Sequence, residues 1–308
     1  MHRMERRDGD FMDKVQTEIL PKFPLFYRER LAACSFLRLC EIRFRAQRPV
    51  MLYYHNRKKF LSIHGGETNQ RSDAVIAGQE DIASIVNAFC KGSVYAYQNY
   101  LKDGFIPLCG GHRIGISGKA VMDGERIINV EEFSGVNIRI AKEFIGSADS
   151  CMPHIYDCCR LSNTVIISPP GYGKTTVLRD IARQLSENYK VVIVDERSEL
   201  AASSKGVPQF DIGDQTDVLE GFPKPMGMLH ALRSLSPDVI VTDEIGTEAD
   251  LLAISALLKG GCKIITSMHG YSIDEALLKK RKLMEQFDTA ILLGKVHGIP
   301  EVVQCRKL

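Results

Sequence analysis

A glycine-rich loop that ends in Lys-Thr is the part of this sequence with the most evident chemistry. The segment SPPGYGKT fits the phosphate-binding pattern G-x-x-x-x-G-K-S/T, except that Ser168 replaces the first glycine. Gly171 and Gly173 let backbone N–H groups surround a phosphate, and Lys174 supplies a cation for the β- and γ-phosphates. The Thr175 hydroxyl can ligate Mg²⁺. The sequence therefore predicts a site for ATP and Mg²⁺, whose loop comprises Ser168, Pro169, Pro170, Gly171, Tyr172, Gly173, Lys174, Thr175 and Thr176.

Hydrolysis of a bound nucleotide also needs a carboxylate that holds the metal and a group that orients water. Two acidic pairs follow predicted strands: Asp243–Glu244 in VIVTDE and Asp195–Glu196 in VVIVDE. We expect Asp243 to hold Mg²⁺ and Glu244 to act as the base. Glu196 is a close competitor as the base, and Asp195 has a similar placement. Because there are two pairs, at least one is expected to belong to a site rather than to a solvated turn.

A histidine completes the candidate catalytic set. His269 lies at the end of a β-rich run, KIITSMHG. A histidine at that place can sense the γ-phosphate through a hydrogen bond. Considered alone, it would be interpreted as a partly buried turn residue, so its assignment depends on the loop and the acidic pairs.

The second half of the chain predicts a parallel sheet that brings these residues together. Short runs dominated by β-branched residues cover 164–167, 191–194, 239–241 and 263–266, and helical stretches separate most of them. Continuous apolar strands that alternate with helices are typical of an α/β fold with both faces covered. Because the carboxyl ends of parallel strands face the ligand crevice, both acidic pairs can reach the γ-phosphate.

The first half has a different, mixed α+β pattern. Charged and apolar residues alternate over 41–46, which predicts a half-buried strand. Residues 79–90 begin with acidic residues and have apolar residues at helical spacing, which predicts a helix. Residues 104–140 form short β-rich runs broken by glycines, which predicts hairpins. In a chain of 308 residues this change predicts two domains, 1–145 and 146–308, the first an interaction or subunit-interface module.

Composition and charge exclude several classes of protein. Apolar residues make up 44%, charged residues 25%, and the net charge is +2. The chain is therefore not disordered, collagen-like or a basic nucleic-acid coat protein. The N-terminal segment MHRMERRDGDFMDK is not followed by an apolar stretch, and no apolar run reaches the ~20 residues of a spanning helix. We expect a cytoplasmic protein without a transmembrane segment, brought to a membrane only by partners.

One basic run needs a separate interpretation. The sequence KKRK at 279–282 follows Asp274 and Glu275, and all six residues are predicted to lie on the same helix. Acidic residues first and basic residues last is the order that the helix dipole favours. The run therefore indicates a solvated helix end, and nucleic acid is not expected as a partner.

The order of several segments gives a resemblance to a known family. They are SPPGYGKTTVLRDIAR, VVIVDERSELA, MLHALRSLSPDVIVTDEIGTEAD and KIITSMHG, preceded by YAYQNYLKDGF, GGHRIGISGKAV and SGVNIRIAKEFIG. Over residues 35–300 the chain resembles the stage III sporulation protein AA family, relatives of the type II and type IV secretion ATPases. The resemblance implies a RecA-like P-loop ATPase core with a smaller N-terminal domain, assembled as a hexameric ring. It also implies that ATP hydrolysis powers a channel complex between mother cell and forespore.

The resemblance also bears on the choice of base. The segment 191–200 matches the Asp box, which carries the catalytic glutamate of secretion ATPases. It therefore raises Glu196, or Asp195, as the base, without settling the choice against Glu244. The pair Asp243–Glu244 matches the Walker B motif, and His269 lies in the segment that matches the His box.

The resemblance also points to arginines as candidate residues of the nucleotide site. Arg233 matches an arginine that secretion ATPases place just before the Walker B strand. Ring ATPases often complete the site with an arginine from a neighbouring subunit or from the N-terminal domain. Arg113 and Arg139 are the candidates, although a surface ion pair explains either one alone equally well.

Two departures from the family pattern keep other functions open. Ser168 stands where a glycine is usual, and Gln215 in DIGDQTDVLEGFPK stands where the family is expected to have an arginine. If that arginine contacts phosphate or a neighbouring subunit, this chain is a nucleotide-gated scaffold with very slow hydrolysis. The shared core and local basic clusters also keep a RecA-like nucleic-acid motor or loader as an alternative.

Overall fold

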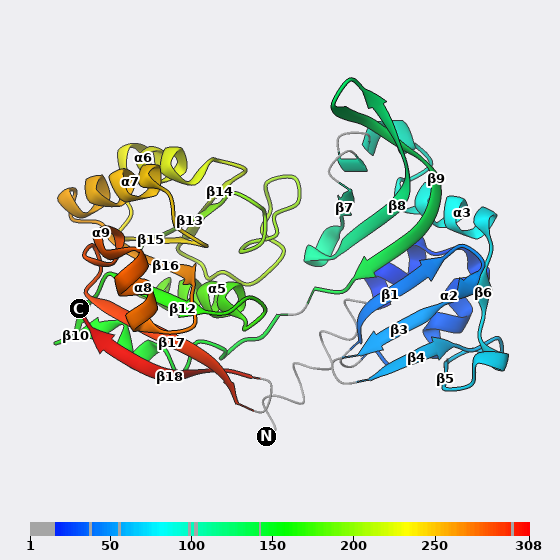
Figure 1. Cartoon of the computed structure of the whole chain (residues 1–308), viewed down its shortest axis with the longest axis horizontal. Helices are drawn as coiled ribbons and strands as arrows, with labels where there is room; N and C mark the ends of the chain where they lie inside the picture. The colour runs from blue at the N-terminus through cyan, green and yellow to red at the C-terminus, as the bar shows by residue number, and fades with distance from the viewer. Residues whose placement is uncertain are drawn as a thin grey trace. The chain divides into compact units, whose positions relative to one another are not determined.

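Each half of the chain has its own sheet and its own hydrophobic core. The structure is a computed structural model that describes residues 16–36, 39–54, 57–97, 100–101, 104–141, 143–296 and 299–308. Two units divide the chain, Met1–Lys142 and Glu143–Leu308, whereas the sequence led us to expect the boundary at 145/146 (Figure 1). The charged N-terminal segment, from which we expected a cytoplasmic protein, lies outside the described residues.

Unit 1 is built on an antiparallel sheet with the strand order β5-β4-β3-β1-β9-β8-β7. A second pair, β2 and β6, lies beside it. Its elements are η1 (Leu20–Lys22), α2 (Leu25–Ala32), β1 (Leu39–Arg45), β2 (Arg48–Pro49), β3 (Met51–Tyr54), β4 (Lys58–Leu61), β5 (Glu67–Thr68), η2 (Arg71–Asp73), β6 (Ile76–Ala77), α3 (Gln79–Phe89), η3 (Val94–Tyr97), β7 (Phe105–Pro107), η4 (Cys109–Gly111), β8 (Arg113–Asp123) and β9 (Arg126–Arg139).

The predicted strand and helix of unit 1 both form, because their side-chain patterns match what they bury. In β1 the alternation turns Ile42 and Phe44 into the core. In α3 the Asp81 carboxylate accepts the Gly78 N–H at 2.7 Å, which caps the first turn. The helix buries its apolar residues, Ile82, Ile85, Val86 and Phe89. The mixed α+β prediction for this half is thus confirmed in these elements.

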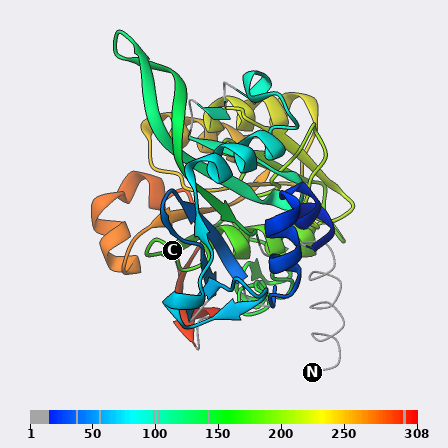
Figure 2. The same ribbon diagram turned by 90° about the vertical axis from the view of Figure 1, so that its right-hand side faces the viewer.

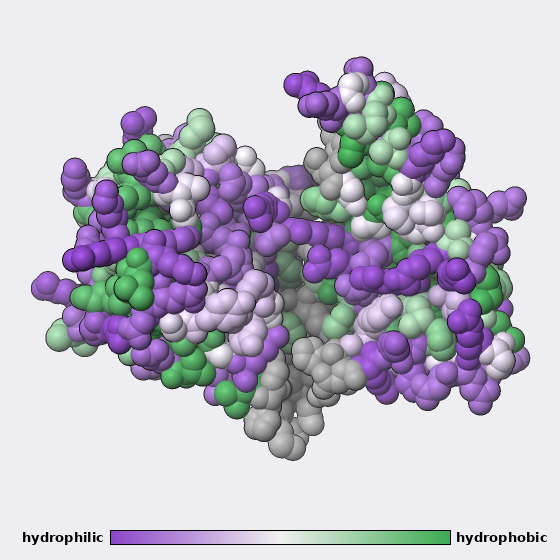
Figure 3. Space-filling model, viewed as in Figure 1, coloured by the Kyte–Doolittle hydropathy of each residue, from purple (hydrophilic) through white to green (hydrophobic). Residues whose placement is uncertain are grey.

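The predicted hairpins appear as one long ribbon of β8 and β9, with β7 paired to its base. The turn of this ribbon is at Gly124, which has a positive φ of 57°. The ribbon extends beyond the rest of its unit (Figure 2). Near the turn it exposes Met122, Ile127 and Ile128. Figure 3 shows hydrophobic side chains among hydrophilic ones on this part of unit 1.

A buried histidine in unit 1 makes stability depend on pH. His112 is 2% exposed, and its Nδ1 accepts the Ala141 N–H at 2.9 Å. Burial, with a smaller effect of Lys22, lowers its pKa from 6.5 to about 4. The unfolded chain therefore binds a proton between pH 6.5 and 4 that the folded chain does not. We expect stability to fall by about 3 kcal/mol as the pH falls through this window.

Denaturant unfolding of the whole chain between pH 4 and 7 measures this loss. The variant His112→Asn, which keeps an acceptor at this position but does not titrate, should show a shallower slope. The matched control is His64→Gln, because His64 is an exposed histidine of the same unit. An unchanged slope for His112→Asn would contradict the prediction.

Unit 2 has a mainly parallel sheet with the order β14-β13-β15-β16-β12-β17-β18, in which only β18 is antiparallel to its neighbour. Its elements are η5 (Met152–His154), β10 (Tyr156–Asp157), β11 (Arg160–Leu161), β12 (Thr164–Ser168), α5 (Lys174–Leu185), β13 (Val191–Asp195), β14 (Thr216–Glu220), α6 (Lys224–Ser234), β15 (Val239–Thr242), α7 (Glu248–Lys259), β16 (Lys263–His269), α8 (Ile273–Lys279), α9 (Arg281–Met284), β17 (Thr289–Val296) and β18 (Ile299–Lys307).

Helices cover both faces of this sheet, as the apolar runs predict. Every residue of β12 and β13 is buried. Alternate side chains face two separate cores: Ile166 and Ile193 pack with α5, whereas Val165 and Val192 pack with α6, α7, α8 and α9. Each residue of a strand thus meets an apolar layer, which is why the strands lack polar alternation.

The helix expected to carry KKRK is broken, so that part of the prediction is wrong. Helix α8 ends at Lys279, and α9 begins at Arg281. Between them Lys280 leaves the helical conformation, with φ −132° and ψ 42°. Its ammonium lies near Gly246. Lys279 keeps the expected helix-end position and pairs with Glu275 at 2.7 Å.

In the described part of the chain, none of the helices is both long enough and apolar enough to cross a membrane.

Candidate functional site

The glycine-rich loop connects β12 to α5, which begins at Lys174 as predicted. Gly171 and Gly173 both have positive φ, 75° and 87°. This left-handed backbone conformation favours glycine. It lets the N–H groups of the loop and of the first turn of α5 point toward the same phosphate position. The Lys174 ammonium is buried and donates to the carbonyl oxygens of Ser168 at 3.1 Å and Pro169 at 3.3 Å. Burial lowers the pKa of Lys174.

Ser168 occupies the position of the missing glycine without disturbing the loop. It is the last residue of β12, is fully buried, and pairs with His269 in the register of β16. Its hydroxyl donates to the Pro169 carbonyl at 3.1 Å. A small side chain fits at this strand end, because the turn into the loop begins only after it.

The C-terminal hairpin packs directly on the loop. A Cβ at Gly173 would lie 2.5 Å from Pro300 Cγ, and the Lys295 ammonium lies 5.3 Å from the Tyr172 ring centroid. We therefore expect Gly173→Ala to destabilise the chain and to weaken nucleotide binding. Adopting a left-handed φ alone costs about 1–2 kcal/mol, and the clash with Pro300 adds to it.

The matched control is Gly171→Ala. Gly171 has a similar φ, but none of the residues that the structure describes has an atom within 4 Å of the Cβ that it would gain, its chain neighbours aside. Denaturant unfolding and fluorescent-nucleotide titration of both variants distinguish the cost of the left-handed backbone conformation from the effect of the clash with Pro300. Equal losses in the two variants would show that the Pro300 contact is unimportant.

His269 connects the loop lysine to Glu244. Its Nδ1 lies 2.9 Å from Lys174 Nζ, and its Nε2 lies 2.7 Å from Glu244 Oε1. An ammonium can only donate, so Nδ1 accepts and Nε2–H donates to the carboxylate. This fixes the tautomer of the ring. His269, predicted from one β-rich run, is thus placed between the loop and one of the two candidate bases.

The backbone around Glu244 is held on two sides. The Glu244 N–H donates to Ser267 Oγ at 3.2 Å, and the Ile245 N–H donates to the Ser267 carbonyl at 2.9 Å. On the other side Asp250 accepts the N–H groups of Gly246 and Thr247 at 2.9 and 2.8 Å, which caps α7. The strand end and the helix cap together direct Glu244.

Asp195 and Glu196 have different environments although they are neighbours. The Asp195 carboxylate is fully buried and accepts the N–H groups of three residues, Glu199, Leu200 and Ala201, at 2.8, 3.0 and 2.8 Å. It organises its own loop, which argues against Asp195 as the base. The Glu196 side chain is 39% exposed, as is that of Glu244.

Arg179 of α5 holds the same loop from the other side. Its guanidinium is buried and donates to the carbonyl oxygens of Leu200 and Glu199 at 2.5 and 2.7 Å. It also lies 3.8 Å from the centroid of the Phe210 ring. Burial lowers its pKa to about 10, against the opposing effect of nearby carboxylates. The helix that follows the phosphate-binding loop is therefore tied to the loop that carries Glu196.

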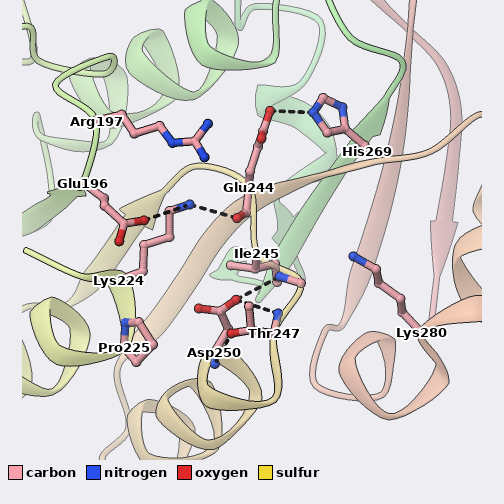
Figure 4. A pocket seen from close by; sticks show the side chains of 11 residues that line it. Glu196, Arg197, Lys224, Pro225, Glu244, Ile245, Thr247, Asp250, His269 and Lys280 are labelled. Atoms are coloured by element: carbon pink, nitrogen blue, oxygen red, sulfur yellow. Dashed lines mark hydrogen bonds and ion pairs between the residues drawn. The ribbon is translucent and has the colours of Figure 1, made fainter. Parts of the chain in front are cut away.

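A pocket of about 360 Å³ lies at the ends of β13, β15 and β16, and its lining includes Glu196, Lys224, Glu244, His269 and Lys280 (Figure 4). Lys224 lies between the two glutamates in this view. Its ammonium is 3.2 Å from Asp243 Oδ1 and 3.6 Å from Glu196 Oε2, and donates to the Glu244 carbonyl at 2.9 Å.

Asp243 has the properties expected of a metal-holding carboxylate. It is 4% exposed, and burial raises its pKa although Lys224 opposes this shift. Apart from the ion pair with Lys224, its Oδ1 accepts no hydrogen bond from the described residues. A buried oxygen in this state fits a ligand for a hard cation such as Mg²⁺. Thr175, the second residue of α5, lies at the helix start where its hydroxyl is expected to help.

Two predicted residues lie away from this edge of the sheet. Arg233 is in the last turn of α6, roughly 14 Å along the helix from Lys224, so it does not join the site within this chain. Gln215 precedes β14, at the amino ends of the strands, and donates to the Ser186 carbonyl at 2.9 Å. It therefore supplies a hydrogen-bond donor to the carbonyl at the C-terminal end of α5. In its own chain it contacts no phosphate position. A role of Arg233 at a nucleotide stays a prediction.

Arg113 and Arg139 belong to unit 1, on β8 and β9. They pair with each other in the β-ladder register. Arg113 lies 5.2 Å from the Phe105 ring centroid, and Arg139 lies 4.0 Å from Glu41. Their role at a nucleotide stays a prediction.

The comparisons with known proteins decide the family. The family described as "Sporulation stage III, protein AA" matches residues 26–305. The stage III sporulation protein AA of Bacillus subtilis (strain 168) is 34% identical over 297 residues, which cover 93% of this chain and 92% of that protein. The chain belongs to the stage III sporulation protein AA family. The resemblance inferred from the motifs is thereby confirmed.

Solved structures confirm the fold class of this family member. The chain resembles the ATPase DotB of Legionella pneumophila with 15% identity and a TM-score of 0.53, covering 87% of this chain and 77% of that one. It also resembles the pilus retraction motor PilT with bound ADP, with 12% identity and a TM-score of 0.55, covering 92% and 81%. At these identities the likeness concerns the fold, which is that of the RecA-like secretion ATPases.

Two residues that contribute to the site were missed from the sequence of this family member. Lys224 had a signal: a lysine between two prolines at a helix start, where the dipole disfavours a cation. Arg179 had none, because one helical turn of α5 does not show which loop lies beside it.

Proposed function

We propose that the chain is a Mg²⁺-dependent ATPase of the secretion-ATPase type. The observation that supports this most is the connection from Lys174 through His269 to Glu244, with distances of 2.9 and 2.7 Å. It joins a phosphate-binding cation to a carboxylate that can accept a proton. The PilT structure, which has the same fold, contains ADP, and this supports an adenine nucleotide as the ligand.

In the proposed reaction the chain's own groups bind the phosphates and accept a proton. Lys174 exchanges its carbonyl partners for oxygens of the β- and γ-phosphates. Glu244 accepts a proton from the water that attacks the γ-phosphorus, and ADP and phosphate leave. The Nε2–H of His269 orients the Glu244 carboxylate. Glu196, on the neighbouring loop, is the competing base.

Mg²⁺ would be held by Thr175 and Asp243 together with phosphate oxygens. These residues fit the ion because one supplies a hydroxyl and the other a buried carboxylate oxygen that accepts no hydrogen bond from the described residues. The chemistry that the ion supplies when bound is neutralisation of charge on the phosphates.

The wider role is proposed from membership of the sporulation family. Six copies form a ring that powers a channel complex between mother cell and forespore, in contact with its protein partners. Arg113 or Arg139, or Arg233 from a neighbouring copy, completes the nucleotide site in that ring.

Measurement of solution mass and ATP turnover on the same sample tests the proposal. With ATP and Mg²⁺ we expect phosphate release and a shift from the 34.4 kDa monomer toward six times that mass. Chelation of Mg²⁺ should stop turnover. Absence of turnover at high protein concentration, where a ring would form, would remove the ATPase assignment.

A further inference from the structure

The lysine that the sequence reasoning missed has an unusual place in the fold. Lys224 is the first residue of α6, between Pro223 and Pro225. A cation at a helix N-terminus meets the positive end of the helix dipole. It is also 7% exposed, and a buried ammonium is costly unless it is paired. Both effects require compensation from nearby oxygens.

Three oxygens compensate the Lys224 ammonium, which has three N–H donors. They are Asp243 Oδ1 at 3.2 Å, Glu196 Oε2 at 3.6 Å and the Glu244 carbonyl at 2.9 Å. Two of the three come from the end of β15 and one from the end of β13. The ammonium therefore lies where the candidate metal-holding carboxylate and the two candidate bases meet. Figure 4 shows its contacts with Glu196 and with the Glu244 carbonyl.

The Asp243 oxygen that pairs with Lys224 is also a candidate ligand for a metal ion. Asp243 Oδ1 accepts no hydrogen bond within the described residues, so the ammonium is its main compensation. A divalent cation that binds Asp243 must compete with this internal charge. Without the ammonium, the buried carboxylate would attract a free cation much more strongly.

We propose that Lys224 is a built-in counter-ion that keeps this site from binding free divalent cations until nucleotide supplies further ligands. The inference rests on the proposed function for the assignment of Asp243 to Mg²⁺. Lys224 acts as a positioning residue: it holds the Asp243 and Glu196 carboxylates and the Glu244 backbone around one charge. Phosphate oxygens then give the metal the additional ligands with which it displaces the ammonium from Asp243.

Binding of Mn²⁺ to the nucleotide-free protein, followed by electron paramagnetic resonance, tests the proposal directly. We expect Lys224→Met to bind Mn²⁺ at least tenfold more tightly than the wild type. Lys224→Arg keeps the charge and should bind Mn²⁺ as weakly as the wild type. The double variant Lys224→Met, Asp243→Asn should lose the gain.

The matched control is Lys280→Met, which removes a lysine that lines the same pocket but has no ion pair with Asp243 among the described contacts. It should leave Mn²⁺ affinity within about threefold of the wild type, since a screened charge without direct contact has a small effect. An equal gain in both single variants, or no gain in Lys224→Met, would overturn the proposal. If Lys224→Met fails to fold, Lys224→Gln tests the same point, because it can still donate to the Glu244 carbonyl.

ATP turnover of the wild-type sample distinguishes failure of the counter-ion role from failure of the proposed function. If the wild type hydrolyses ATP and Lys224→Met binds Mn²⁺ no better, the counter-ion role is wrong and the proposed function stands. If the wild type shows no turnover, the proposed function fails whatever the Mn²⁺ result.

Discussion

Replacing Lys174 with alanine is expected to lower ATP turnover by at least about 10²-fold. The Lys174 ammonium is buried at the start of α5, and its hydrogen-bond partners among the described residues are two backbone carbonyls and His269. Nothing else on the loop supplies a cation to the β- and γ-phosphates. The loss also removes the 2.9 Å contact that links the loop to His269. Phosphate release under saturating Mg²⁺ and ATP measures the effect.

The control for this variant is Lys190→Ala. Lys190 is in the same unit, but its side chain is 60% exposed and pairs only loosely with Asp238 at 3.9 Å. An exposed pair of this kind contributes little. Its removal should leave turnover unchanged. Equal turnover by Lys174→Ala and the wild type would place the nucleotide site elsewhere.

Glu244→Gln is expected to lower the rate of hydrolysis by about 10²–10⁴-fold while nucleotide still binds. The amide keeps the shape of the side chain and accepts the Nε2–H of His269, but it cannot take a proton from water. Binding should persist because Lys174 and the loop are intact. Single-turnover hydrolysis gives the rate, and fluorescent-nucleotide titration gives the affinity.

Glu196→Gln is the comparison that decides between the two candidate bases. Both side chains are 39% exposed, so exposure does not distinguish them. Glu244 is connected to Lys174 through His269, whereas the ion-pair partner of Glu196 among the described residues is Lys224, at 3.6 Å. We therefore expect a smaller loss from Glu196→Gln. A larger loss than that of Glu244→Gln would make Glu196 the base.

Much of unit 2 could be predicted from the sequence because the signals are local. The strand, loop and helix of residues 164–183 are contiguous. A glycine-rich loop that ends in lysine between a strand and a helix has few functions other than phosphate binding. The runs of β-branched residues predicted a sheet with both faces covered. In the structure every residue of β12 and β13 is buried. The break at Lys280 was missed because it depends on contacts of that residue outside the helix, near Gly246.

The roles of individual carboxylates could not be predicted in the same way. Asp195 and Glu196 are adjacent in the sequence, yet one accepts three backbone N–H groups and the other faces the pocket. Successive residues near a strand end point in different directions. The conformation of the following loop decides which of the two carboxylates accepts hydrogen bonds from backbone N–H groups. Arg233 was assigned by its position in a motif, although it lies in the last turn of α6, roughly 14 Å along that helix from Lys224.

The sequence by itself determined the α/β class of unit 2, the phosphate-binding loop and the family, because these depend on residue order and spacing. Only the tertiary structure decided that His269 bridges Lys174 and Glu244, and that Lys224 lies among Asp243, Glu196 and the Glu244 backbone. These contacts join residues up to 95 positions apart along the chain. Their geometry depends on which strands are neighbours and where each one ends, and no local pattern records that.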